Sequence, residues 1–295
     1  MGPHCAMTID VEDWFHVENL RSAIARDTWE TCESRVVANT QRMLALLDNA
    51  HVSATFFVLG WVAERRPQLV RDIADAGHEI ASHGHGHELV SHLSPDAFTQ
   101  DADRARKLLQ DLSGQPVDGY RAPCFSITDW ALPILRHLGH AYDASYHPIA
   151  GHDRYGQLRG IDPDRTLTEV LPGFYEAAVT TLPLPSPLTG RRLPWGGGGY
   201  FRLMPYRLYR AGLRRRLAAW RPVVFYLHPW EIDPGQPRLG KAHGLGRLAA
   251  FRHYVHLERT ADKWQRLLHD LPWGRLDELI ASHAHAADHP LRRAA

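Results

Sequence analysis

The chain has 295 residues, 44% of them hydrophobic, which is enough apolar material for a folded core and excludes a disordered chain. Its formal net charge is +1 with the histidines neutral, so charge does not favour nucleic acid or an acidic membrane as a partner. No stretch approaches the roughly 18 apolar residues of a spanning helix, and we expect no membrane span.

The cysteines and the first residues bear on the compartment. Cys5, Cys32 and Cys124 fit neither a disulfide framework nor a zinc ribbon. Three reduced thiols are typical of a reducing compartment. Residues 1–6 show no apolar run behind a basic region, and so no secretory signal. We therefore expect a cytoplasmic protein, while the oligomeric state stays open.

The first part of the chain alternates between apolar, β-branched runs and segments of helical spacing. Gly77 marks a helix end, and Ser94 with Pro95 marks a helix start. The predicted elements are a strand within 6–16, a helix over 34–50, a strand over 53–59, a helix over 67–76, a strand over 79–82 and a helix from 94 to about 112.

The second part continues this pattern, with Thr128 as a predicted helix cap. The predicted elements are a helix over 128–138, strands over 141–146, 167–171 and 179–182, a basic and solvated helix over 207–220, a strand over 222–231 and a helix over 253–271. This alternation favours a mostly parallel sheet or barrel. We expect one domain over 1–295, with its core at about 7–280 and a frayed tail after 283.

Residues 195–201 form a glycine run between aromatic residues. The run lacks the spacing of a phosphate-binding loop. Two interpretations stay open, a surface linker and a loop beside a ligand.

Acids and imidazoles stand where predicted strands end. Asp10, Glu12 and Asp13 follow the first strand, and chemistry in α/β folds usually sits at the carboxyl ends of strands. The alternative for these acids is a solvated loop or a helix cap. His83 and His87 follow the strand over 79–82, and residues four apart share one face of a turn. Histidine is a common zinc ligand, although a polar loop without a ligand also fits this tract.

Taken together, these groups suit metal-assisted hydrolysis of an amide. Two imidazoles and one carboxylate, with other positions left to water, are typical of a catalytic rather than a structural metal site. A second carboxylate can accept a proton from water. His228, at the end of the strand over 222–231, can protonate the leaving group, although a lone histidine there is often structural.

The ordered motifs Thr-Ile-Asp-Val-Glu-Asp, His-Gly-His-Gly-His, Arg-Ala-Pro, Tyr-Asp-Ala-Ser and Leu-His-Pro-Trp-Glu resemble the polysaccharide deacetylase family (NodB homology, carbohydrate esterase 4). The likeness is greatest to the branch associated with exopolysaccharide loci and exosortase systems. The resemblance covers about residues 7 to 280. It implies a distorted, incomplete (β/α) barrel and a divalent metal of the zinc type, Zn²⁺.

The resemblance also implies roles for the matching residues. Asp10 matches the family's base, His83 and His87 its metal ligands, and Arg121 the arginine that pairs with the base. The metal carboxylate is Glu12 or Asp13. Residues i and i+2 of a strand share a face, which favours Glu12 beside Asp10.

On the opposite side of the site, His228 matches the catalytic acid and Asp143 the carboxylate that orients it. The backbone N–H of Cys124 falls where the family completes its oxyanion site. Leu227 and Trp230 stand where the substrate is expected, with Leu227 lining the pocket for the acetyl methyl group.

The implied activity is removal of N-acetyl groups from amino sugars of a bacterial exopolysaccharide or its precursor, polymeric or lipid-linked. The expected partner is an N-acetylated glycan. Two alternatives stay open, a cyclic-amide hydrolase on the same fold and a carbohydrate-binding relative without activity. A small closed pocket would favour the cyclic amide.

Overall fold

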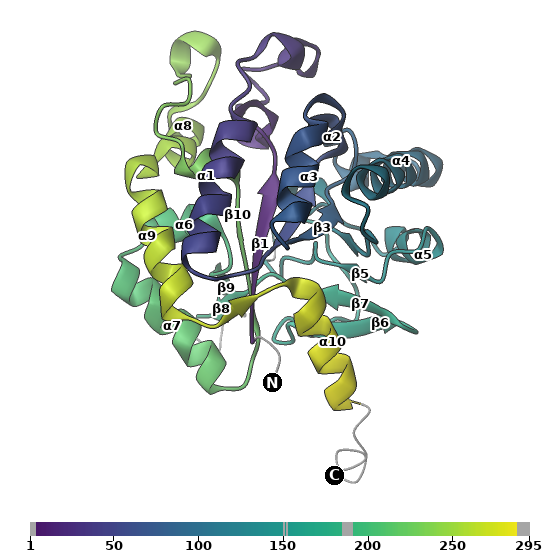
Figure 1. Ribbon diagram of the computed structural model, residues 1–295. Coiled ribbons are helices and arrows are strands. Elements are labelled where there is room, and N and C mark those ends of the chain that lie inside the picture. Colours follow the sequence, from purple (N-terminus) through teal and green to yellow (C-terminus); the bar gives the residue numbers. More distant parts are fainter. Residues whose placement is uncertain (1–3, 150, 152, 185–190, 288–295) are drawn as a thin grey trace.

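The computed structural model describes residues 4–149, 151, 153–184 and 191–287, which form an α/β fold around one curled sheet (Figure 1). The strands are β1 (Cys5–Val11), β2 (Thr55–Val58), β3 (Glu79–Ser82), β4 (Gly119–Tyr120), β5 (Tyr142–Asp143), β6 (Leu167–Leu171), β7 (Phe174–Ala177), β8 (Thr181–Pro183), β9 (Arg192–Pro194), β10 (Val223–Leu227) and β11 (Trp273–Gly274).

The order of the main sheet is that of an open barrel. It runs β10-β1-β2-β3-β4-β5-β7-β6, with β11 pairing β1 beside this path, and β8 with β9 forms a separate hairpin. The pairings along the path are parallel except for the antiparallel β6–β7 pair. Among the described strands the edges β10 and β6 do not pair with each other. The predicted fold class, an incomplete (β/α) barrel, is confirmed.

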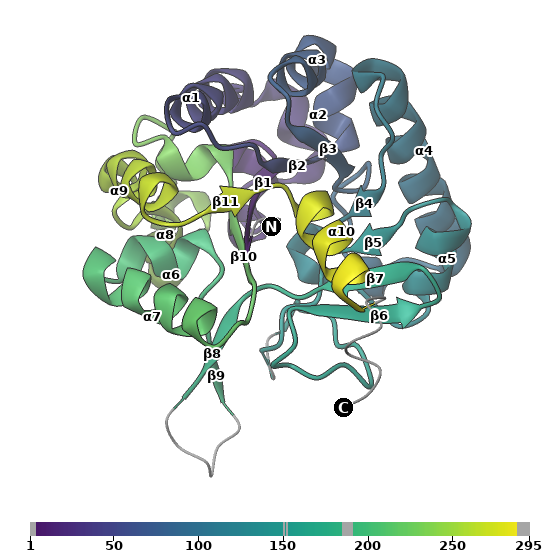
Figure 2. The same cartoon turned by 60° about the horizontal axis from the view of Figure 1, so that its bottom comes forward.

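The helices are α1 (Val36–Asn49), α2 (Gly60–Arg65), α3 (Pro67–Asp75), α4 (Pro95–Ser113), α5 (Ala131–His137), α6 (Gly198–Leu203), α7 (Tyr206–Ala218), α8 (Arg247–Tyr254), α9 (Leu257–Asp270) and α10 (Leu276–Ala287). Figure 2 shows most of them around the outside of the curled sheet. α10 instead packs Leu276 and Leu279 against Ala6 and Val224, near the start of β1 and β10. It therefore covers the amino-terminal end of the barrel, and the carboxyl ends of the strands are left for the site.

The side chains of β1 alternate between two environments. Cys5, Met7 and Ile9 pack in the apolar layer between sheet and helices. Ala6 belongs to the cluster inside the barrel, and Asp10 shares its parity. This period of two sends the carboxylate of Asp10 inward.

The glycine run is a closely packed segment rather than a flexible linker. Gly198 begins α6, and a Cβ on Gly196 would lie 2.6 Å from the Val224 carbonyl oxygen. A Cβ on Gly197 would lie 2.5 Å from the Tyr226 hydroxyl. These glycines are needed because the backbone passes directly against β10.

Other boundaries differ where tertiary contacts override local pattern. The predicted helix over 253–271 corresponds to α9, but residues 253 and 254 belong to the end of α8, and His256, with a φ of 53°, separates the two helices. Thr128 does not cap α5, whose cap residue is Trp130. α2 and β7 were not predicted. α10 extends to Ala287, so no frayed tail begins at 283, and the rest of that predicted tail lies outside the described residues.

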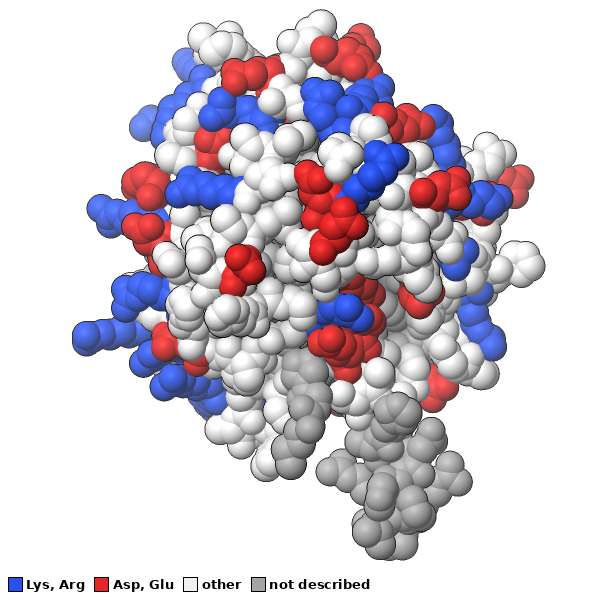
Figure 3. Space-filling view, viewed as in Figure 1, with Lys and Arg blue, Asp and Glu red and all other residues white. Residues whose placement is uncertain are grey.

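The basic helix over 207–220 is α7. Arg207, Arg214 and Arg215 are exposed on it, which agrees with the predicted solvated face. Figure 3 shows cationic side chains gathered at the lower left, where Figure 1 places α7. In the described part of the chain, none of the helices has the length and apolar content needed to cross a bilayer.

Candidate active site

Three predicted ligands meet at the carboxyl ends of β1 and β3. Glu12, His83 and His87 are buried, and each offers a ligand atom within 4.8 Å of the others. Glu12 Oε2 faces His87 Nε2 at 2.6 Å, and His87 is the one described side chain that approaches this oxygen as a donor. A buried carboxylate needs a positive partner, which is either a protonated His87 or a cation held by Glu12 and both imidazoles. This donor set of one carboxylate and two imidazoles therefore fits a divalent metal.

The tautomer of His83 also suits a metal. Its Nδ1 lies 2.8 Å from the Arg121 carbonyl oxygen, which can only accept, so Nδ1 carries the proton. The lone pair of Nε2 is then free for a cation. Burial, the largest influence, lowers the pKa of His83 to about 4 and keeps the ring neutral.

The loop between the two histidines is held from α4. Both carboxylate oxygens of Asp101 accept backbone N–H groups, from His85 at 2.8 Å and from Gly86 at 2.9 Å. His87 takes a left-handed φ of 55°. The His85 ring points away from the ligands and lies 3.1 Å from Glu64. Asp101 was not predicted, because a contact between residues so far apart in the chain leaves no periodic signal.

Asp10 lies beside this group and is fixed by Arg121, as predicted. Arg121 Nη1 donates to Asp10 Oδ1 at 2.6 Å and to Thr8 Oγ1 at 2.8 Å. The guanidinium is fully buried and stacks over the Phe57 ring. Asp10 Oδ2 remains oriented towards His228 Nε2, 3.8 Å away. One carboxylate oxygen is thus held in place while the other faces the pocket.

His228 faces the acids from the end of β10, and Glu231 holds it there. His228 Nδ1 lies 2.8 Å from Glu231 Oε1, and Arg202 Nε donates to Glu231 Oε2 at 2.8 Å. His228 Nε2 lies 3.3 Å from Glu12 Oε1. Burial lowers the pKa of His228, but Glu12, Glu231 and Asp10 raise it to about 9. These carboxylates favour the charged form of the ring, which can donate through Nε2.

The prediction that Asp143 orients His228 is corrected by this geometry. Asp143 accepts a hydrogen bond from Ser145 Oγ at 2.6 Å and pairs with Glu176. Burial raises the pKa of both carboxyl groups, which favours a proton shared between them. Glu231 could have been found in the sequence, because it stands three residues after His228, as in a capping box.

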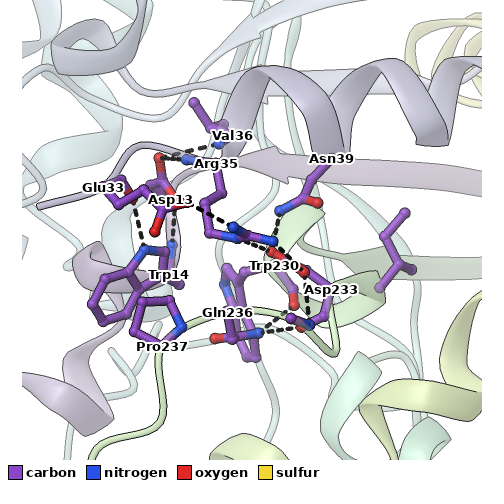
Figure 4. A network of polar contacts seen from close by, with 12 residues as sticks. Asp13, Trp14, Glu33, Arg35, Val36, Asn39, Trp230, Asp233, Gln236 and Pro237 are labelled. Atoms are coloured by element: carbon purple, nitrogen blue, oxygen red, sulfur yellow. Dashed lines mark hydrogen bonds and ion pairs between the residues drawn. The ribbon is translucent and has the colours of Figure 1, made fainter.

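Asp13 lies outside the group formed by Glu12, His83 and His87. Its Oδ1 accepts the Trp14 N–H, and its Oδ2 accepts the N–H groups of Arg35 and Val36 at the start of α1 (Figure 4). The carboxylate therefore caps two helix starts. Glu12 follows the parity of Asp10 and reaches the histidines, so of the two candidates Glu12 is the one in the metal-binding geometry.

Of the three residues predicted to contact substrate, two line the pocket and one does not. Leu227 is fully buried in the layer between sheet and helices, so it does not line the pocket, and its neighbour Tyr226 does. Trp230 lines the pocket but is stacked between the rings of His228 and His253. Cys124 lines the pocket with a φ of 52°.

The site contains one cavity of about 730 Å³. Asp10, Glu12, His83, His87 and His228 all line it. Its volume is in the range of pockets that take a ligand of several rings. The arrangement combines a base, a cation site and an acid around a single cavity.

Two protein-family models match adjacent segments of the chain. Residues 26–142 match the polysaccharide deacetylase family, and residues 144–281 match a family described as a domain of unknown function, DUF3473. Strands from both segments share the main sheet.

The curated relatives match only a segment of this chain and a segment of their own length. The chain is 32% identical over 148 residues to the peptidoglycan deacetylase-like protein FGM2 of Gibberella zeae, covering 50% of this chain and 41% of the relative. It is 34% identical over 109 residues to a peptidoglycan deacetylase of Helicobacter pylori, covering 35% and 36%. The chain thus spans less than half the length of these relatives.

A crystal structure from Mycobacterium smegmatis, provisionally named a polysaccharide deacetylase, shares the fold. It has a TM-score of 0.56 and 23% identity, covering 97% of this chain and 92% of that one. Over residues 26–142 the chain therefore matches the polysaccharide deacetylase family model, and its fold is shared with a structure that carries the same name.

Proposed function

We propose that this protein is a metal-dependent hydrolase that removes N-acetyl groups from amino sugars of a bacterial exopolysaccharide or its precursor. The observation that carries the proposal is the convergence of Asp10, the Glu12–His83–His87 group and His228 on one cavity. The relatives named as peptidoglycan deacetylases support the class of bond. A volume of about 730 Å³ exceeds what a small ureide ring needs, so it does not favour the cyclic-amide alternative.

Zinc is the ion we propose for Glu12, His83 and His87, because imidazole and carboxylate ligands suit it. When bound, such an ion polarises a carbonyl oxygen and lowers the pKa of water. We propose the cytoplasm as the compartment, since Cys5, Cys32 and Cys124 are all free thiols.

The protein's own groups carry the proton transfers. Asp10, held through Oδ1 by Arg121, accepts a proton from the attacking water on Oδ2. His228 donates its Nε2 proton to the amine nitrogen as the C–N bond breaks, and Glu231 keeps the Nδ1 proton in place. Acetate and the free amino sugar are the products.

The experiment measures acetate release from N-acetylglucosamine oligomers by native protein, by chelated protein with and without added zinc, and by Asp10→Asn. We expect chelation to abolish activity and zinc to restore it. Asp10→Asn should lower kcat by about 10²- to 10⁴-fold while zinc content stays near native. Its melting temperature should fall, because the buried Arg121 loses its charged partner. Unchanged acetate release by a folded, zinc-loaded Asp10→Asn protein would refute the mechanism.

A further inference from the structure

One wall of the cavity is apolar and exposed. In the described part of the chain six large hydrophobic side chains are exposed, and four of them line this cavity. Two come from α6, Tyr200 at 39% and Leu203 at 47% exposure, and two from α8, Leu248 at 61% and Phe251 at 54%. The exposed apolar surface is thus concentrated at the mouth of the site.

The spacing of these residues makes a continuous wall. Leu248, Phe251 and Val255 stand at i, i+3 and i+7 along α8 and its end, and all three line the cavity. Tyr200 and Leu203 stand at i and i+3 on α6. Helical residues at these separations share one face, so each helix presents an apolar stripe to the same space.

Leucines do not suit a sugar. Sugar hydroxyl groups need hydrogen-bond partners when they leave water, and a leucine supplies none. Aromatic rings can lie against a sugar face, but Leu203 and Leu248 offer only aliphatic surface. Exposed apolar surface grouped at a pocket is typical of a binding site for an apolar group.

A cation adjoins this wall. Arg252 follows Phe251 on α8, lines the same cavity and is exposed. Its side chain makes no ion pair with any described residue, whereas Arg192, another lining residue, is bound to Asp164 at 2.8 Å. An uncommitted guanidinium beside an apolar wall is complementary to a phosphate that carries an aliphatic chain.

We propose that the substrate is an N-acetylated amino sugar joined through a phosphate to an aliphatic chain. The inference rests on the proposed deacetylase activity. The sugar lies between Asp10 and His228, the phosphate beside Arg252, and the chain against Tyr200, Leu203, Leu248 and Phe251. The reaction that supplies this substrate is then attack of a lipid alcohol on a nucleotide-activated N-acetylated sugar, which transfers the sugar phosphate to the lipid and releases a nucleoside monophosphate, before polymerisation.

The test compares two phosphodiesters of N-acetylglucosamine, one with a decyl and one with a methyl group on the phosphate, below the micelle concentration. Each buried methylene strengthens binding by roughly fourfold, so several half-buried ones give a large effect. We expect the native protein to show at least a tenfold higher kcat/KM for the decyl ester. Leu248→Ser with Phe251→Ser should bring the decyl-to-methyl ratio close to one.

Matched controls come from the same surface. Among the residues that the structure describes, Leu208 and Trp220 are the two exposed large hydrophobic ones that do not line the cavity, so Leu208→Ser with Trp220→Ser should keep the native ratio. Arg252→Gln should weaken binding of both phosphodiesters relative to a decyl glycoside without phosphate. Arg247→Gln, an exposed arginine of α8 outside the cavity lining, should not.

Equilibrium binding of decyl phosphate separates this proposal from the proposed function. Binding that depends on Leu248 and Phe251, in a protein that releases no acetate, would keep the lipid subsite and overturn the deacetylase. Acetate release with a decyl-to-methyl ratio near one would overturn the lipid subsite. The lipid subsite would also be overturned if sedimentation showed a dimer that Leu248→Ser with Phe251→Ser converts to monomer. It would be overturned as well if both esters were used equally and the protein bound anionic vesicles through Leu248 and Phe251.

Discussion

A methyl group added at Gly198 should disable His228 without touching it. An alanine Cβ at this position would lie well inside 3.0 Å of both carboxylate oxygens of Glu231, closer than real Cβ atoms approach. The carboxylate cannot turn away freely, because it is held by His228 Nδ1 and Arg202 Nε at 2.8 Å each. Gly198→Ala therefore forces the Glu231–His228 contact apart.

The size of the effect follows from that contact. The Glu231 carboxylate has to move by roughly 1 Å, and a shift of that size in a catalytic arrangement costs about 10²-fold. Loss of a hydrogen bond to a charged group costs about 1.5–3 kcal/mol, which corresponds to a similar factor. We expect kcat/KM for acetate release to fall by about 10- to 100-fold, and the basic limb of the pH profile to move to lower pH, because Glu231 raises the pKa of His228.

The neighbouring glycine provides the control. A Cβ on Gly199, in the same helix, would meet nothing within 4 Å. Gly199→Ala should keep both the rate and the pH profile, with a small gain in stability from helix propensity. If Gly198→Ala matched Gly199→Ala in rate and pH profile, Glu231 would not be positioning His228.

Three further predictions concern the metal carboxylate, the acid and a buried carboxyl group. Glu12→Gln should lose bound zinc, measured by atomic emission, whereas Asp13→Asn should keep it and melt at lower temperature, since Asp13 caps α1; loss of zinc in Asp13→Asn alone would reverse the assignment. Glu231→Gln should lower kcat by about 10- to 100-fold, through loss of a charge-assisted bond, with zinc content unchanged; a native rate would contradict it. Burial and then Asp277 raise the pKa of Glu79 from 4.5 to about 8, so the folded state binds the extra proton in this range and stability falls as pH rises from 4.5 to 8. Glu79→Gln should therefore gain stability relative to native protein between pH 5 and pH 8 in urea titrations, and an unchanged difference would count against a protonated Glu79.

The local sequence pattern was sufficient to predict the bounds of elements whose apolar residues face one layer of the core. β3 and β6 begin and end at the predicted residues, and α4 starts at the predicted Ser94 cap. A period of two along β1 also favoured Glu12 over Asp13, because the parity of a strand continues for a residue or two beyond its end. The sequence alone thus determined a mostly parallel sheet or barrel and the residues that could form a metal site, and its resemblance to a known family implied the incomplete barrel.

Only the tertiary structure decided which partner each of these groups has. Glu231 rather than Asp143 holds His228, and Asp13 caps α1, because distant segments supply the donors that compete for each carboxylate. The glycine run looked flexible because glycine is permissive locally. It is packed because Val224, Tyr226 and Glu231 occupy the space that side chains would need. Hydrogen bonds and close approaches between segments depend on how the sheet curls, and no local period encodes that curvature.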